Sequence, residues 1–120
     1  MQIDDLLYGI NELHLRELEL MDCYMTPGIL SQILDAVSQN IETKDEDKRI
    51  YKLNFSQTIP TDFLNNDESR EILLKFIKRH HKHDRVPYME VFGGKNGSTM
   101  DSYCEVNGKL AISYCDAEEN

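Results

Sequence analysis

The residue types with the clearest chemical potential gather in one short charged segment, residues 79–85. It reads Arg-His-His-Lys-His-Asp-Arg and holds three of the four histidines of the chain. His80 and His83 have the i, i+3 spacing that places two side chains on one face of a helix, and neutral imidazole is the commonest metal ligand. A zinc site normally needs four ligands, and the cysteines are far away in the sequence. We therefore expect a polar helix end, whose cations the helix dipole favours.

Other arrangements could support catalysis or phosphate binding, but each lacks an essential part. Cys23 and His14 could in principle form a nucleophile and its base, yet free cysteines are more often buried and inert. The glycine-rich segment 93–98 lacks the spacing of a phosphate-binding loop. Acid pairs such as 4–5 and 45/47 are more typical of a solvated surface than of general acid–base catalysis. We expect no enzymatic activity, no cofactor and no bound metal.

Charge is unevenly distributed along the chain. The 120 residues include 22 acidic and 13 basic side chains, a net charge of −9. Within 70–85, six Lys and Arg outnumber two acids, so this segment carries +4 and the remainder −13. The acidic whole disfavours non-specific binding to nucleic acid or to a membrane surface. A local basic site could still bind phosphate or RNA, and its residues would be Lys75, Lys78, Arg79, Lys82 and Arg85.

Length and composition predict a single domain, 1–120, that can bury a core. Apolar residues make up 40% of the chain, with 6 Gly and 3 Pro. No apolar run approaches the ~18 residues that span a bilayer, and Asp4 and Asp5 stand where a signal peptide carries cations. The cysteines lack CxxC spacing, which argues against a disulfide framework, although Cys104 and Cys115 could pair in a secreted protein. We expect an intracellular, cytoplasmic protein.

One apolar pattern occurs three times along the chain. Each copy has three apolar residues followed by a residue of another kind, and the copies are Leu15, Leu18, Leu20 and Cys23; Ile50, Leu53, Phe55 and Thr58; and Val86, Met89, Val91 and Gly94. Aligning Leu18, Leu53 and Met89 gives steps of 35 and 36 residues. A nearly constant period is the signature of a structural repeat, so we expect three strands in equivalent positions.

A helical pattern follows the first of these strands. Thr26 is expected to be the N-cap and Pro27 the first helical residue. Apolar residues from 29 to 37 then recur at helical spacing, and we expect the helix to end near Asn40. Segment 42–49 contains no apolar side chain and is expected to be a solvated loop.

A second helical pattern follows the second strand, with Asn66 or Asp67 as its cap and its end near Lys82. The ends of the chain are expected to cap the fold through a helix over 3–13 and a β-hairpin over 102–115, because the Asn-Gly pair at 107–108 is a strong turn signal. The expected core comprises Leu6, Ile10, Leu18, Leu20, Ile29, Ile33, Leu53, Phe55, Leu73, Phe76, Ile77, Met89 and Val91.

The first copy of the pattern resembles the strand of a leucine-rich repeat. Its spacing, Leu15-x-x-Leu18-x-Leu20-x-x-Cys23, is similar to the family pattern, in which alternating leucines point inward and an Asn or Cys satisfies backbone groups in the turn. The helix that follows resembles the convex-face helix of the long, ribonuclease-inhibitor-like repeats. The resemblance covers residues 13–94, with Thr58 and Gly94 at the Asn or Cys position. It implies an α/β fold of short strand–helix repeats with parallel strands.

The resemblance and the charge distribution together predict a non-catalytic protein-interaction module, an adaptor or a small inhibitor. In leucine-rich repeats the open strand face usually carries recognition, and its outward positions here would be Arg16, Glu17, Glu19, Lys52, Asn54 and Glu90. An acidic, bipolar surface suits electrostatic steering toward a partner protein with a basic surface. The alternative is a small nucleic-acid or phosphate-ligand binder that uses the basic helix end, 75–85. A metal-dependent protein or a small enzyme is less favoured.

Overall fold

The computed structural model describes residues 3–13, 15–60, 63–90, 99–106 and 109–115, with side chains up to residue 90 apart from those of Ser56 and Asn65. The elements follow the order α1 (Ile3–Glu12), β1 (Glu17–Tyr24), α2 (Pro27–Thr43), β2 (Lys52–Ile59), a single 3-10 turn η1 (Phe63–Asn65), α3 (Asp67–His81), β3 (Tyr88–Glu90), β4 (Thr99–Val106) and β5 (Lys109–Cys115).

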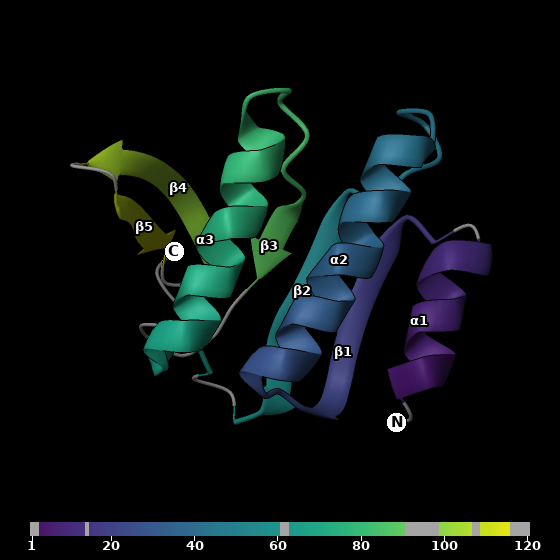
Figure 1. Ribbon diagram of the computed structural model, residues 1–120, viewed down its shortest axis with the longest axis horizontal. Coiled ribbons are helices and arrows are strands. Elements are labelled where there is room, and N and C mark those ends of the chain that lie inside the picture. Colours follow the sequence, from purple (N-terminus) through teal and green to yellow (C-terminus); the bar gives the residue numbers. More distant parts are fainter. Residues whose placement is uncertain (1–2, 14, 61–62, 91–98, 107–108, 116–120) are drawn as a thin grey trace.

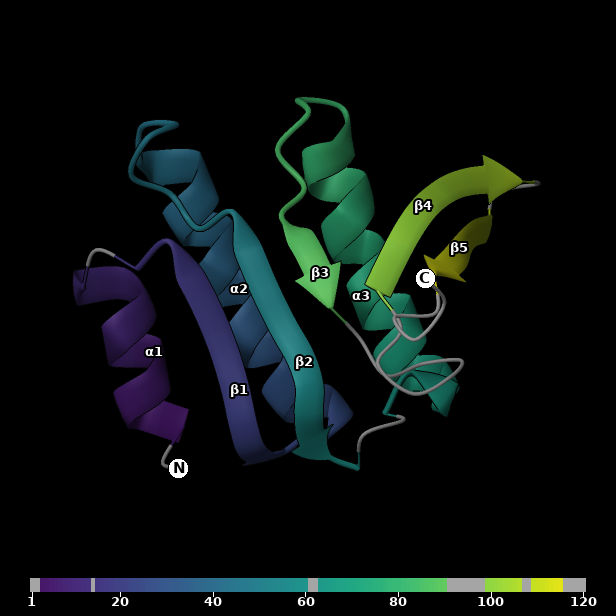
Figure 2. The same ribbon diagram turned by 180° about the vertical axis from the view of Figure 1, so that it is seen from behind.

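The strands form one sheet in the order β1-β2-β3-β4-β5. β1, β2 and β3 run parallel to one another, whereas β4 pairs antiparallel with both β3 and β5. All three α-helices lie on one face of the sheet (Figure 1). Seen from behind, β1 and β2 stand in front of the helices with no helix over them (Figure 2). The α/β class with neighbouring parallel strands, expected from the sequence, is confirmed.

The register of the parallel strands follows the spacing of the apolar pattern. Leu18 is the register partner of Leu53, and Leu53 is the partner of Met89. All three side chains are buried beneath the helices. The residues that the 35- and 36-residue steps aligned therefore lie side by side across three strands.

Two irregularities shift the pairing of β1 with β2. The register slips between Glu19 and Met21 and again between Met21 and Tyr24, and the second slip includes Asp22 at φ 56°. Asp tolerates this left-handed conformation better than most residues. The two slips compensate, because Glu17 pairs with Lys52 at one end and Tyr24 with Ile59 at the other.

The predicted helix caps are confirmed. The Thr26 side chain accepts a hydrogen bond from the Ile29 N–H at 3.2 Å, and the Asn66 side chain accepts one from the Ser69 N–H at 3.0 Å. The prediction that α2 ends near Asn40 is wrong, since the helix continues to Thr43. Its last turn stays helical because it is buried on the core side, where Ile41 is fully enclosed.

The remaining boundaries differ little from the predicted ones. α1 ends one residue early, α3 ends at His81, and β3 covers only Tyr88–Glu90. β4 and β5 pair antiparallel, with Val106 opposite Lys109, while the Asn-Gly pair and positions 91 and 94 lie outside the described residues. In this register Cys104 is opposite Ala111 and Cys115 opposite Thr99, so the two cysteines are not partners across the ladder.

The core fills the space between the helices and the sheet. Of the expected core residues, Leu6 and Ile29 are only partly buried and Val91 lies outside the described residues, whereas the others are buried.

Asn40 is a polar exception that was not expected. It is 2% exposed, its amide N–H donates to the Ile10 carbonyl at 3.2 Å, and its amide oxygen accepts from the Ile50 N–H at 2.9 Å. One side chain thus ties α1 and the start of β2 to α2.

Candidate protein-interaction site

The face of the sheet that carries no helix, called here the open face, is formed by alternate residues of β1 and β2. Glu17 and Glu19 are exposed and Leu18 between them is buried. Because successive side chains of a strand point to opposite faces, the two glutamates lie on the open face. Their register partners in β2, Lys52 and Asn54, are half-buried. Each predicted partner-binding position of β1 therefore lies beside one of β2.

The third strand adds Glu90 to this face. It is the register partner of Asn54, and its two carboxylate oxygens are both used. Lys52 Nζ lies 3.3 Å from Oε1, and the Asn54 amide donates to Oε2 at 3.0 Å. This carboxylate raises the pKa of Lys52 through a hydrogen bond and its charge. The Lys52 ammonium also lies 5.9 Å from the centre of the Tyr88 ring. One cation therefore contacts both a carboxylate and an aromatic ring.

Arg16, the sixth predicted residue, lies just before β1 and has a different role. Its guanidinium donates to the main-chain carbonyls of Arg49, at 3.0 Å, and of Asp47. It also lies over the Tyr51 ring, 5.0 Å from its centre. The side chain is exposed, but its donors hold the loop after α2 against the start of the sheet.

Tyr51 joins this group to the first glutamate of β1. Its hydroxyl donates to Glu17 Oε1 at 2.9 Å. That hydrogen bond, together with the nearby carboxylate charge, raises the pKa of Tyr51. Tyr51 as a whole is still 48% exposed. The sequence reasoning missed Tyr51 because it directly precedes the strand and follows the buried Ile50.

Exposed apolar side chains form the other end of the open face. Met21 and Tyr24 of β1 are 48% and 70% exposed, and Ile59 of β2 is 40% exposed. In a regular strand Tyr24 would share the buried face with Leu18. The shift at Asp22 changes the alternation, so that Cys23 is buried and Tyr24 exposed.

The corresponding shift in β2 buries Thr58 and exposes Gln57 and Ile59. These apolar positions were not predicted, because apolar residues in a strand are normally assigned to the core. An Asp within an apolar strand, as at position 22, was the available signal, since Asp is depleted in strands and tolerates positive φ.

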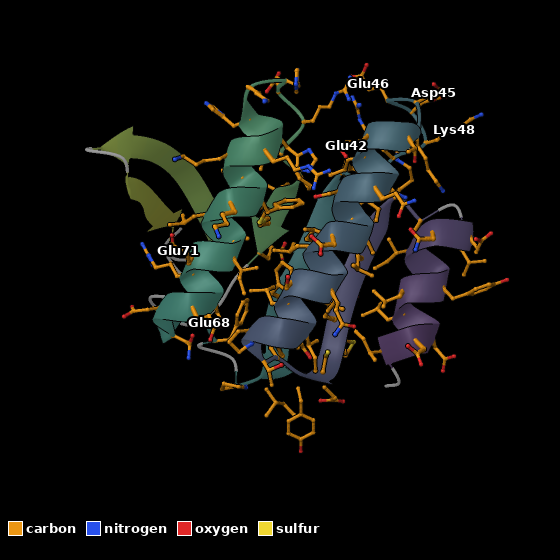
Figure 3. All side chains as sticks on the ribbon, viewed as in Figure 1. Glu42, Asp45, Glu46, Lys48, Glu68 and Glu71 are labelled. Atoms are coloured by element: carbon orange, nitrogen blue, oxygen red, sulfur yellow. The ribbon has the colours of Figure 1, made fainter. Side chains whose placement is uncertain are left out.

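The basic end of α3 lies on the helical side of the molecule. Lys75, Lys78, Lys82 and Arg85 are exposed. Arg79 is exposed as well, and it forms a bidentate pair with Glu42 of α2, with Nε to Oε2 at 3.0 Å and Nη2 to Oε1 at 2.6 Å. The Arg79 hydrogen bond lowers the pKa of that carboxyl group. Glu42 lies at the C-terminal end of α2. Glu68 and Glu71 lie near the N-terminal end of α3, which is the end opposite to the basic one (Figure 3).

A groove of about 210 Å³ runs between α2 and α3. Two cations, Lys75 and Arg79, line it together with Asp35 and the hydroxyl groups of Ser31 and Ser38. The carboxylate of Asp35 within the groove and that of Glu42, which is paired with Arg79, offset the positive charge of these cations. The groove therefore does not present a uniformly basic surface to a phosphate.

The two histidines with helical spacing occupy different environments. His80 is 1% exposed, its Nε2 lies 2.8 Å from Ser38 Oγ, and its ring packs 4.8 Å from that of Phe76. Burial lowers the pKa of His80 from its usual 6.5, whereas His83 is exposed. Within the described part of the chain, no group of three or more His, Cys, Asp or Glu side chains could hold a metal ion.

The other candidate catalytic groups are not assembled among the described residues. Cys23 is buried, and burial raises the pKa of its thiol, which disfavours the reactive thiolate. His14 and the glycine-rich segment 93–98 lie outside the described residues. The acid pairs of α1 and of the loop after α2 are exposed.

Comparisons of the sequence and the structure with protein-family models, with curated proteins and with solved structures found no match. In the described segments no helix combines the length and apolar character needed to cross a membrane.

Proposed function

We propose that the protein is a non-catalytic interaction module that binds a partner protein through the open face of its sheet. The observation that carries this proposal is the set of five large apolar or aromatic side chains left exposed on β1, β2 and β3 or directly before β2: Met21, Tyr24, Tyr51, Ile59 and Tyr88. Exposed apolar patches are a mark of interaction sites, and Tyr and Met are enriched in protein interfaces.

Charge on the same strands favours a basic partner. β1 and β3 contribute the carboxylates of Glu17, Glu19, Asp22 and Glu90, whereas Lys52 is the only cation among the described residues of the three parallel strands. Complementary charge speeds association and excludes partners of the same sign. Because salt screens such attraction between exposed groups, binding should weaken as the salt concentration rises.

We further propose that the strand–helix units are degenerate leucine-rich-repeat-like repeats, an architecture suited to an adaptor or a small inhibitor. The nearly equal register steps, 35 residues from Leu18 to Leu53 and 36 from Leu53 to Met89, support this proposal. So does the equivalence of Cys23 and Thr58, which are 35 positions apart and are both buried where their strands end. The Thr58 hydroxyl lies 3.0 Å from the Phe55 carbonyl oxygen and 3.2 Å from that of Pro60. Its single hydrogen can be donated to either of these backbone carbonyls, a role similar to that of the family's Asn or Cys.

Affinity capture with matched surface variants tests the proposed binding. The double variant Tyr24→Ser with Ile59→Ser should lose the specific partner, because it removes apolar contacts from the open face. Tyr8→Ser should retain it, since Tyr8 is similarly exposed, at 64%, but lies on α1. Mass spectrometry of the captured proteins at low and high salt gives the measurement.

Equal recovery of the same partner by both variants and at both salt concentrations would contradict the proposal. The double variant Lys78→Glu with Lys82→Glu tests the alternative, a phosphate or nucleic-acid site on α3. If only this variant loses the bound molecule, recognition belongs to the basic end of α3.

A further inference from the structure

We infer that recognition is confined to one half of the open face, the carboxyl-end half, where Glu19 binds a cation of the partner beside the apolar side chains of Met21, Tyr24 and Ile59. The occupant is a segment of a partner protein that carries Arg or Lys next to apolar side chains. This inference rests on the proposed function and adds to it the chemistry of the partner and the residues that recognise it.

The amino-end half of the open face is already occupied by its own contacts. The Tyr51 hydroxyl donates to Glu17 at 2.9 Å, and Glu90 accepts from both Lys52 and Asn54. A partner cation would have to displace these donors before it could pair with either carboxylate. Because hydrogen bonds exchanged in this way give little net free energy, these groups position the strands and contribute little to binding.

The two aromatic rings of the amino-end half are occupied as well. The guanidinium of Arg16 lies 5.0 Å from the centre of the Tyr51 ring, and the ammonium of Lys52 lies 5.9 Å from that of Tyr88. A cation–π contact with a partner would replace one that already exists. Four of the six positions predicted to bind a partner therefore belong to this half, in which the side chains already bond to one another. They are Glu17, Lys52, Asn54 and Glu90.

The carboxyl-end half offers groups that the fold does not use. Among the described residues, no hydrogen bond or ion pair involves the side chain of Glu19, which is exposed on the rung that it shares with Asn54, at the border of the two halves and directly before the register shift. Beyond it lie Met21 and Tyr24, the latter with Ile59 as its register partner. The exposed fractions of these three side chains are 48%, 70% and 40%. A carboxylate thus borders an apolar surface.

This combination matches a long basic side chain. Arg and Lys bury their methylene stems on apolar surface while the charged group stays at a polar site, and the planar guanidinium of Arg also stacks on aromatic rings such as that of Tyr24. From Glu19 to Tyr24 the strand extends roughly 16 Å at ~3.3 Å per residue. An extended peptide of about four or five residues would cover it, with a cation at one end and apolar groups at the other.

Selection from a library of short random peptides displayed on phage tests this inference without a known partner. Peptides that bind the intact chain should carry Arg or Lys beside aliphatic or aromatic residues. Glu19→Gln should weaken their binding about tenfold, and Tyr24→Ser should do so by at least as much. Glu17→Gln, whose carboxylate already bonds to Tyr51, should have a smaller effect than Glu19→Gln. Glu71→Gln, at an exposed position on α3, is the matched control and should change the dissociation constant by less than about twofold. Thermal unfolding of each variant verifies that it is folded.

The possible outcomes separate the inference from the proposed function. Peptides that depend on Tyr24 but lack a cation, or that ignore Glu19→Gln, overturn the inference and leave the sheet face as the binding site. Peptides that ignore both Glu19→Gln and Tyr24→Ser count against the inference and against the proposed function. If no peptide is enriched over a surface without protein, the inference is rejected, while affinity capture decides the proposed function independently.

Discussion

Replacement of Asn40 by alanine is expected to lower the free energy of unfolding by about 2–4 kcal/mol, because a buried group left without its hydrogen-bond partner costs ~1–3 kcal/mol. The substitution would leave two such groups, the Ile10 carbonyl and the Ile50 N–H, and both residues are at most 2% exposed. It would also remove the one side chain that bonds both to α1 and to the start of β2. Urea denaturation followed by circular dichroism measures the loss.

Two further variants make the Asn40 test specific. Gln39→Ala, an exposed neighbour on the same helix, should stay within ~0.5 kcal/mol of the natural chain. Asn40→Asp keeps an acceptor for Ile50 but turns a carboxylate oxygen toward the Ile10 carbonyl, so it should destabilise the fold at neutral pH. An Asn40→Ala variant as stable as Gln39→Ala would refute the anchoring role.

The second large effect is expected at His80, where stability should fall as the pH drops from about 7 toward 5.5. Burial lowers the pKa of His80 below its usual 6.5, so the unfolded chain binds this proton more readily than the folded chain. Its contribution to stability is therefore complete above the unfolded pKa and is lost below it. Glu42 opposes the pKa shift, whereas Arg79, Arg85 and His83 add to it.

Substitutions separate the proton from the packing of His80. His80→Gln keeps a side chain that can bond to Ser38 but cannot titrate, so its stability should vary less with pH between 7 and 5.5. His83→Gln, at an exposed position, should keep the pH dependence of the natural chain. His80→Ala should cost about 2–4 kcal/mol at pH 7 because it leaves a cavity beside Phe76. A natural chain equally stable at pH 7 and 5.5 would contradict this interpretation.

Local chemistry explains which features could be predicted from the sequence. The caps at Thr26 and Asn66 depend on side chains within three residues of the amides that they bind. The parallel strands depend on an apolar spacing that occurs around Leu18 and again around Leu53. The caps and the parallel pairing of these strands, both expected from such local patterns, are confirmed.

Contacts between distant residues explain what could not be predicted. Arg16 was assigned to the partner because an exposed cation next to a strand gives no sign that its guanidinium bonds to carbonyls 31 and 33 positions away. Asn40 was expected at a helix end, yet it is buried because α1 and the start of β2 supply its partners. The exposure of Tyr24 could not be predicted, because the shift at Asp22 changes the face on which the following residues lie.

The exposure of Tyr24 at the apolar end of the sheet results from this shift. Without it, period-two alternation would bury Tyr24 with Leu18 and Leu20 and expose Cys23. Asp22, at φ 56°, reverses this arrangement. The irregularity at Asp22 thus places Tyr24 on the open face and Cys23 in the core. Met21 is exposed by regular alternation, and Ile59 by the shift in β2.

The central claim is that the open face of the sheet, and not the helical face, contacts the partner. Photo-cross-linking with benzoylphenylalanine at either of two tyrosine positions tests it most directly. The probe at Tyr24 should form a covalent adduct with one partner protein in cells that make the chain, and Glu19→Lys should remove that adduct. The probe at Tyr8, on α1, should form none. An adduct from Tyr8 with none from Tyr24 would contradict the claim. A Tyr24 adduct that Glu19→Lys leaves unchanged would overturn the role of Glu19 and leave the open face as the contact surface.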